Sequence, residues 1–340
     1  MKAAVCHNSA DPLAIEQRPD PAPGPGEVLI RVERCGICGS ELHMRDGPAR
    51  AFPGGMVMGH EIAGEVVALG EGVAGPGIGR RVAVYPAVGC GACRACETGN
   101  QILCPEATRL LGGFAEYAAI PAAAAIELPD HLTPADGALI EPLTVSWYGV
   151  RLAELRPGAR VVVLGAGTIA LSAIYWARRS GAGRIAALSR SPRRAELALR
   201  MGADAFLAYG DDEVAEAAEA LGGPADAVFE CVGAPGFLGK AIDHAGLMGQ
   251  VLSLGFGGEP DPVIPAVAGF RGVTLQFPVG YSQDDFRHVA REMTQGHVDP
   301  KIMISSTVAL DDLPATFEEL LGANAQTKVQ VAPFAPGHPQ

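Results

Sequence analysis

Basic residues are scarce in this 340-residue chain, which has 26 Lys and Arg against 38 Asp and Glu and a formal net charge of −12. A protein that binds nucleic acid needs surplus positive charge to neutralise phosphates. The composition therefore argues against a nucleic-acid partner and favours a small-molecule ligand.

Long apolar runs are also missing. Apolar residues make up 48% of the chain, but Gly, Pro or charged residues interrupt each run before it reaches the length of a membrane-spanning helix. The first residues, Met1 to Cys6, have the pattern of a strand and not the apolar segment of a secretory signal. We therefore expect a cytoplasmic protein with no membrane partner, whose cysteines stay reduced.

A regular string of cysteines stands in the first third of the chain. The spacing Cys-x2-Cys-x2-Cys-x7-Cys is formed by Cys90, Cys93, Cys96 and Cys104. Four thiolates can surround one zinc ion as a closed tetrahedron, which leaves no position for a substrate. Disulfides or separate core cysteines are the alternative, and the regular spacing and the reducing compartment disfavour both. The string predicts a structural zinc lobe at about residues 88–106.

Two kinds of pattern divide the chain, as its length leads us to expect. In the first part, short runs such as Glu27 to Val32 and His60 to Ala68 alternate with Gly and Pro, which is typical of a β-rich domain. From about Leu155, buried strands alternate with helices, predicted at residues 169–180, 192–201 and 212–221. This rhythm predicts an α/β fold with a doubly wound parallel sheet.

A second set of metal-ligand residue types lies outside the cysteine string. An open, catalytic zinc needs about three protein ligands and one exchangeable position. We expect Cys38, His60 and Glu141 to be the ligands, with Glu61 able to replace a water or join the shell. A buried thiol beside a surface histidine is the alternative. The cysteine string nearby favours the interpretation of these residues as a metal site over this alternative.

A glycine turn, Gly165-Ala166-Gly167, stands between a predicted strand and a predicted helix that begins with Thr168 and Ile169. Gly165 permits the tight turn, Gly167 lets the backbone approach a pyrophosphate, and the helix N-terminus offers N–H donors. Such a turn also occurs in other α/β proteins. Its place in the chain favours a dinucleotide site.

The end of the next strand indicates which dinucleotide binds. A site that prefers NAD has Asp or Glu there to accept hydrogen bonds from the ribose hydroxyls. This chain has Ser189 followed by Arg190. Ser189 can donate a hydrogen bond to a 2′-phosphate, and Arg190 can form an ion pair with it. Arg193 or Arg194 can assist. A solvated Arg190 at a helix entry is the alternative. The sequence predicts a preference for NADP(H).

Together these motifs resemble the zinc-dependent medium-chain dehydrogenase/reductase family, which includes alcohol, sorbitol, butanediol and threonine dehydrogenases. The resemblance covers nearly the whole chain, and further matching segments are Pro23 to Ile30, Cys38 to His43, Gly59 to Glu61, Gly113 to Ala118 and Glu141 to Leu143. It implies a β-rich (GroES-like) catalytic domain at residues 1–148 and 286–340. It also implies an inserted Rossmann coenzyme domain at residues 149–285 and a homodimer or homotetramer.

The resemblance also implies roles for single residues. Cys38, His60 and Glu141 would hold the catalytic zinc, and Glu61 would exchange with water. Ser40 and His43 match the proton-relay positions of the family. The chain departs from the family pattern at Glu41, where aspartate is usual, and at Ala170, where a third glycine is commonest.

The substrate is the least determined part of the prediction. Several apolar residues could line an apolar cleft, and these are Met44, Phe52, Met56, Met58, Phe270, Phe277 and Tyr281. The aromatic ones could equally be core. An apolar cleft favours a secondary or cyclic alcohol and its ketone, because a polyol needs more hydrogen-bond partners. The alternatives are a polyol, sugar or amino-alcohol dehydrogenase and a non-catalytic nucleotide-binding relative.

Overall fold

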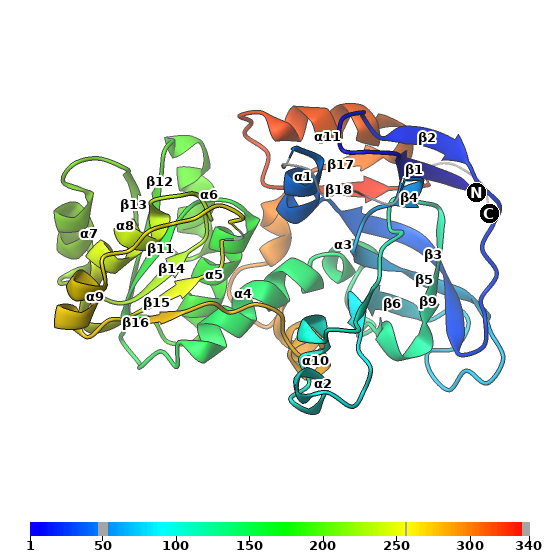
Figure 1. The fold of residues 1–340 in the computed structure, drawn as a ribbon, viewed down its shortest axis with the longest axis horizontal. Helices are drawn as coiled ribbons and strands as arrows, with labels where there is room; N and C mark the ends of the chain where they lie inside the picture. Colours follow the sequence, from blue (N-terminus) through cyan, green and yellow to red (C-terminus); the bar gives the residue numbers. More distant parts are fainter. Residues whose placement is uncertain (47–53, 256, 335–340) are drawn as a thin grey trace. The chain divides into compact units, whose positions relative to one another are not determined.

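The computed structural model describes residues 1–46, 54–255 and 257–334 (Figure 1). Phe52, which was expected near the substrate, lies outside the described residues. The chain divides into two compact units: Met1–Glu141 with Ser282–Arg291 and Ile304–Gln340, and Pro142–Tyr281 with Glu292–Met303. The second unit is thus inserted in the first. The domain boundaries expected from the sequence stay a prediction.

The first unit is built on a seven-stranded, largely antiparallel sheet. Its order is β10 (Ala125–Glu127), β6 (Arg81–Val84), β5 (Glu61–Leu69), β3 (Glu27–Gly36), β18 (Lys328–Ala332) and β17 (Ile304–Ala309), and β9 (Tyr117–Pro121) also pairs with β3. In β3, Val28, Ile30 and Val32 alternate with less buried residues and enter the main core of this unit. A smaller sheet has the order β2 (Ala14–Gln17), β1 (Lys2–Cys6) and β4 (Met56–Val57).

The register of the large sheet brings three distant segments to one end of it. Gly36, the last residue of β3, is opposite Glu61, the first residue of β5, and also opposite Gln330 in β18. Residues 35–38, 60–62 and 328–331 therefore meet although they are far apart in the chain.

Short elements complete the first unit. They are α1 (Gly39–Asp46), β7 (Ala87–Val88), α2 (Arg94–Glu97), β8 (Thr108–Arg109), α3 (Pro134–Gly137), the start of α4 (Ile140–Leu152), most of α10 (Gln283–Glu292) and α11 (Leu313–Leu321). Strands β7 and β8 pair with each other, and α2, which lies between them in the chain, buries no residue. The cysteine lobe thus has little core of its own.

The second unit has the predicted parallel sheet. Its order is β13 (Ala205–Ala208), β12 (Arg184–Ser189), β11 (Arg160–Leu164), β14 (Ala225–Glu230), β15 (Ala245–Ser253) and β16 (Thr274–Gln276). The order reverses at β11, which is the topology of a Rossmann fold. The central strands are almost wholly buried, as a sheet covered on both faces requires.

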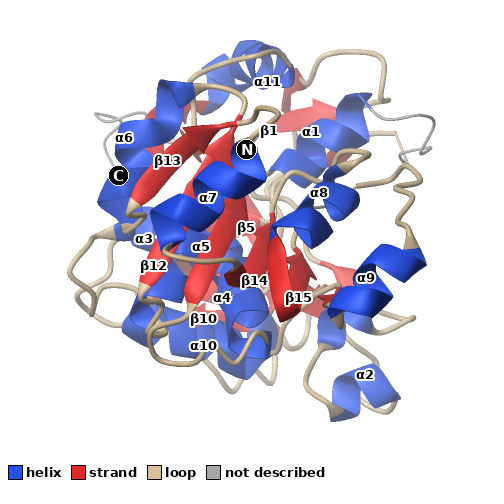
Figure 2. Ribbon diagram, turned by 90° about the vertical axis from the view of Figure 1, so that its left-hand side faces the viewer, coloured by secondary structure: helices blue, strands red, loops and turns tan. Residues whose placement is uncertain are grey.

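Helices connect these strands, and α5 and α7 pack on the central ones (Figure 2). They are α5 (Thr168–Arg179), α6 (Ala195–Met201), α7 (Glu213–Leu221), α8 (Phe237–His244) and α9 (Pro265–Arg271). The predicted helix at 192–201 opens as a 3-10 turn over Pro192–Arg194, and the hydroxyl of its N-cap Ser191 accepts the Arg193 N–H (3.2 Å). No helix in the described part of the chain is long and apolar enough to cross a membrane.

Candidate functional site

Cys38, His60 and Glu61 form one cluster in the first unit. A possible ligand atom of each lies within 4.8 Å of those of the other two. Cys38 follows β3, and His60 directly precedes Glu61 at the start of β5, so the pairing of these strands brings the three together. A thiolate, an imidazole and a carboxylate are the donor types that suit zinc. The residues present therefore fit an open zinc site.

Glu41 connects two of these ligand segments. Its buried carboxylate accepts the N–H groups of Cys38 (3.1 Å) and Gly59 (2.9 Å) and contacts Nδ1 of His60 (2.9 Å). A carboxylate on Nδ1 fixes the imidazole and leaves Nε2 for a metal. In the sequence Glu41 was only a departure from the usual aspartate. The structure shows that its carboxylate orients the histidine.

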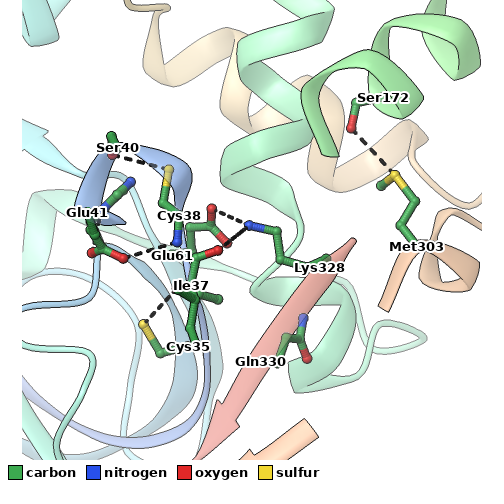
Figure 3. Close-up of polar contacts among 12 residues, drawn as sticks. Cys35, Ile37, Cys38, Ser40, Glu41, Glu61, Ser172, Met303, Lys328 and Gln330 are labelled. Carbon is green, nitrogen blue, oxygen red and sulfur yellow. Dashed lines mark hydrogen bonds and ion pairs between the residues drawn. The ribbon is translucent and has the colours of Figure 1, made fainter. Parts of the chain in front are cut away.

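Lys328 is a site residue that the sequence analysis missed. Its ammonium donates to both carboxylate oxygens of Glu61 (2.7 and 2.8 Å) and to the carbonyl of Ile37 (2.9 Å), as Figure 3 shows. Burial lowers the pKa of Lys328, but the charges of Glu61, Cys38 and Glu141 and the hydrogen bond to Glu61 together outweigh this, and the net pKa is raised. The partners are 267 residues apart, and no motif in the sequence connects them.

Gly36 gives Glu61 its space. A Cβ atom at position 36 would lie 1.7 Å from a carboxylate oxygen of Glu61, so no other residue fits without a shift. The carboxylate is held between this glycine and Lys328.

Glu141, the second residue of α4, is 7% exposed. It is not part of the 4.8 Å cluster, but its charge raises the pKa of both Glu61 and Lys328, so it lies close to them. Glu141, which was predicted as the third ligand, is thus near the site but outside the cluster, where Glu61 accompanies Cys38 and His60.

The two predicted relay residues both lie on α1. The Ser40 hydroxyl donates to Sγ of Cys38 (3.2 Å), whereas His43 is exposed. Within the described residues, no hydrogen bond joins Ser40 to His43. The relay therefore stays a prediction.

The lobe cysteines Cys90, Cys93, Cys96 and Cys104 form the second cluster, with all four sulfur atoms within 4.8 Å of one another. The N–H of Cys90 points to Sγ of Cys104, and the N–H of Gly91 to Sγ of Cys96, both at 3.3 Å. All eight cysteines of the chain are free thiols. Sulfur atoms that accept backbone N–H groups fit thiolate ligands, so this cluster suits a structural zinc.

The glycine turn of the second unit joins β11 to α5 as predicted. Gly165 has φ of +113°, which favours glycine, and Gly167 is the N-cap of α5. A Cβ on Gly167 would meet no atom within 4 Å. The open space beside the N-terminus of the helix, at Thr168 and Ile169, fits a pyrophosphate.

The residues predicted to select the cofactor surround this turn. Ser189 is the last residue of β12, and Arg190 is exposed. Arg194 reaches the turn, since its Nη1 donates to the carbonyl of Ala166 (3.4 Å). Burial lowers the pKa of Arg194, and the charge of Arg193 adds to this.

The apolar residues expected around the substrate do not share one environment. Met58 and Tyr281 are core residues, whereas Phe270 is 91% and Phe277 is 60% exposed. Met44 and Met56 are half-buried. The two exposed aromatic residues are therefore not core, which was the alternative considered for them.

A GroES-like sheet, a Rossmann unit and two clusters of zinc-ligand side chains define a zinc-dependent dehydrogenase. Residues 24–130 match the model of the alcohol dehydrogenase GroES-like domain, and residues 168–295 match that of the zinc-binding dehydrogenases. The chain belongs to the zinc-type medium-chain dehydrogenase/reductase family.

Known relatives extend over almost the whole chain. It is 34% identical to (R,R)-butanediol dehydrogenase of Bacillus subtilis, over 98% of this chain and 100% of the relative. A protein from Sinorhizobium meliloti 1021 solved bound to NADP has a TM-score of 0.88 and 30% identity, covering 98% of this chain and 99% of its own. The rspB alcohol dehydrogenase of Escherichia coli CFT073, complexed with NADH, has a TM-score of 0.89 and 26% identity. The match covers 97% of this chain and 99% of that protein.

Proposed function

We propose that this oxidoreductase transfers hydride between NADP(H) and a secondary or cyclic alcohol and its ketone. The observation that carries the proposal is the cluster of Cys38, His60 and Glu61, supported by Glu41 and Lys328. A protein that only binds nucleotide has no use for such an open set of ligands.

Cys38, His60 and Glu141 would hold the catalytic zinc, while Lys328 keeps Glu61 beside them as the residue that exchanges with water. When bound, zinc supplies Lewis-acid chemistry that lowers the pKa of an alcohol. Ser40 would accept the proton of the alcohol and pass it toward His43. The contact of Ser40 with Cys38 and the exposure of His43 support this relay, because one end is at the ligands and the other in solvent.

The preference for NADP(H) rests on the residues around the glycine turn. Ser189 stands where a carboxylate would repel a 2′-phosphate, and the guanidinium groups of Arg190 and Arg194 can pair with it. The relative solved with NADP supports this, although another binds NADH.

The substrate class is supported by the relative from Bacillus subtilis. The (R,R) descriptor of its butanediol places the hydroxyl groups on stereogenic carbon atoms, so they are secondary. A polyol, sugar or amino alcohol is the second candidate, because this diol also has a neighbouring hydroxyl.

The direct test follows nicotinamide absorbance with NADP(H) and NAD(H) in parallel, against ketones, aldehydes, polyols and amino alcohols. We expect turnover on ketones and secondary alcohols with NADP(H). Turnover with NAD(H) alone would contradict the cofactor assignment. No turnover in the zinc-loaded protein would favour the non-catalytic relative.

We also propose a homo-oligomer, either a dimer or a tetramer, in the cytoplasm. Strand β16 is the edge of the parallel sheet, and several exposed apolar side chains lie in the segments near it, namely Leu247, Met248, Ile264, Val267, Phe270, Phe277 and Val279. Exposed apolar side chains near a sheet edge are suited to burial against another subunit, and we treat these seven as the candidate patch. Phe270→Glu should lower the mass measured by light scattering, and an unchanged mass would exclude this patch. The free thiols support a reducing compartment.

A further inference from the structure

Gln330 is a fully buried amide in β18, two residues after Lys328 on the same strand (Figure 3). Its Nε2 donates to the carbonyl of Ala135 (2.9 Å), whereas its Oε1 has no hydrogen-bond partner among the described residues. An unpaired buried oxygen costs stability, and a methionine would fill a similar volume without that cost. The feature to explain is therefore what the donor end of this amide does for Ala135.

The Ala135 carbonyl lies at the break between α3 and α4. In a continuous α-helix it would accept the N–H of Leu139, but that N–H donates to the carbonyl of Asp136 instead (2.9 Å). Ala138 is the C-cap of α3, so the helix ends there. The carbonyl thus loses its usual helical partner, and the amide of Gln330 supplies a donor from the sheet.

This break leads directly into Glu141, the second residue of α4. Close packing holds one side of the break, because a Cβ atom on Gly137 would lie only 2.7 Å from that of Ala63 in β5. The bond from Gln330 to Ala135 ties the same short helix to β18. Together these contacts fix where α4 begins and therefore where the carboxylate of Glu141 lies.

Glu61, the other carboxylate at the site, is already engaged. Both of its oxygens accept hydrogen bonds from the ammonium of Lys328 (2.7 and 2.8 Å). Direct binding of a metal by Glu61 would weaken this pair in a place that water does not reach, which is costly for a buried charge. That cost favours Glu141 as the carboxylate that completes the metal shell.

We propose that Gln330 is a positioning residue, which fixes the junction of α3 and α4 so that Glu141 can bind the catalytic zinc with Cys38 and His60. This role rests on the proposed function and its ligand set, and it adds a residue that touches neither metal nor substrate. Lys328 and Gln330 are two residues apart in one strand, so both side chains extend to the same face. Strand β18 thus holds both carboxylates of the site, one directly and the other through α3.

The test measures the Kd of zinc in the full-length wild type and in Gln330→Met, by competition with a chromogenic chelator. We expect the Kd of the catalytic site to rise at least about tenfold, as the loss of groups that support a metal ligand usually causes. The Kd of the cysteine lobe should stay the same. In a Glu141→Gln background, Gln330→Met should add no further weakening, because it acts only through that ligand.

Gln250→Met is the matched control, because this half-buried glutamine makes the same kind of bond, from Nε2 to the Ala153 carbonyl (3.0 Å), in the second unit. It should leave both zinc Kd values unchanged. An unchanged Kd in Gln330→Met, or equal weakening with and without Glu141→Gln, would overturn the inference. A wild type that binds zinc only in the lobe, or keeps its catalytic-site Kd in Glu141→Gln, would overturn the proposed ligand set itself and, with it, this role.

Discussion

The Lys328 ammonium lies 2.7 and 2.8 Å from the two carboxylate oxygens of Glu61, and both side chains are almost fully buried. Lys328→Met leaves a buried carboxylate without its counter-charge, so we expect a loss of about 3–5 kcal/mol in the free energy of unfolding, measured with denaturant. Adding Glu61→Gln should recover most of this loss.

A matched control is Lys2→Met, which removes a half-buried lysine paired at 2.8 Å with the exposed Asp311. Because solvent screens that pair, we expect little measurable change. If Glu61→Gln failed to rescue Lys328→Met, the ammonium would be compensating another group.

The cysteine lobe should lose its metal when one thiolate is removed. We expect Cys96→Ser to contain one zinc per chain where the wild type contains two, and to melt at a lower temperature, because α2 buries no residue that could hold the lobe. Metal analysis by mass spectrometry checks this. Cys6→Ala, which removes a buried thiol outside both clusters, should keep two zinc ions.

The cofactor preference should reverse when the charges at positions 189 and 190, which we propose to select the cofactor, are changed. Ser189→Asp with Arg190→Leu adds a carboxylate that accepts ribose hydroxyls and repels a 2′-phosphate. We expect the ratio of kcat/KM for NADP(H) to that for NAD(H) to fall at least about tenfold, as the loss of one charged hydrogen bond implies. An unchanged ratio in steady-state assays would refute the assignment.

His43 should matter for proton release and not for structure, since its side chain is exposed on α1. We expect His43→Ala to lower kcat about tenfold or more and to change the pH–rate profile of alcohol oxidation, because general acid–base groups contribute on this scale. Its melting temperature should match that of the wild type. A variant with the parent profile would remove His43 from the relay.

His244 should make the second unit less stable in mild acid. Burial lowers the pKa of this histidine, although Glu213 at 3.4 Å opposes the shift, and Lys240 and Asp243 also act on it. The unfolded chain therefore binds more protons near pH 6.5, and stability falls as pH drops through this range. We expect His244→Gln to flatten that fall in melting temperature between about pH 7 and 5. Exposed His297→Gln should leave the slope unchanged.

Local patterns in the sequence were enough to predict the fold class and to single out most of the side chains that cluster at the candidate site. The parallel sheet and its glycine turn follow from alternating strands and helices, and each of these signals lies within a few residues. The cysteine string likewise predicts its cluster, because four ligands in fifteen residues can meet without help from the rest of the chain. Cys38 and His60 were predicted as zinc ligands because thiolate and imidazole are donor types that zinc prefers.

Other site residues depend on contacts that no local pattern encodes. Glu41 lies in the matching segment Cys38 to His43, but nothing in that segment indicates that its carboxylate contacts His60, which is 19 residues further along the chain.

The sequence by itself therefore determined the chemistry, namely which thiolates, imidazole and carboxylates can bind zinc and where a dinucleotide turn forms. Only the tertiary structure decided how Glu61 is held. Its partner Lys328 comes from the other end of the chain, and the register of β18 against β3 sets their contact. Burial makes that contact necessary, because a carboxylate with 0% exposure needs a counter-charge that water cannot replace.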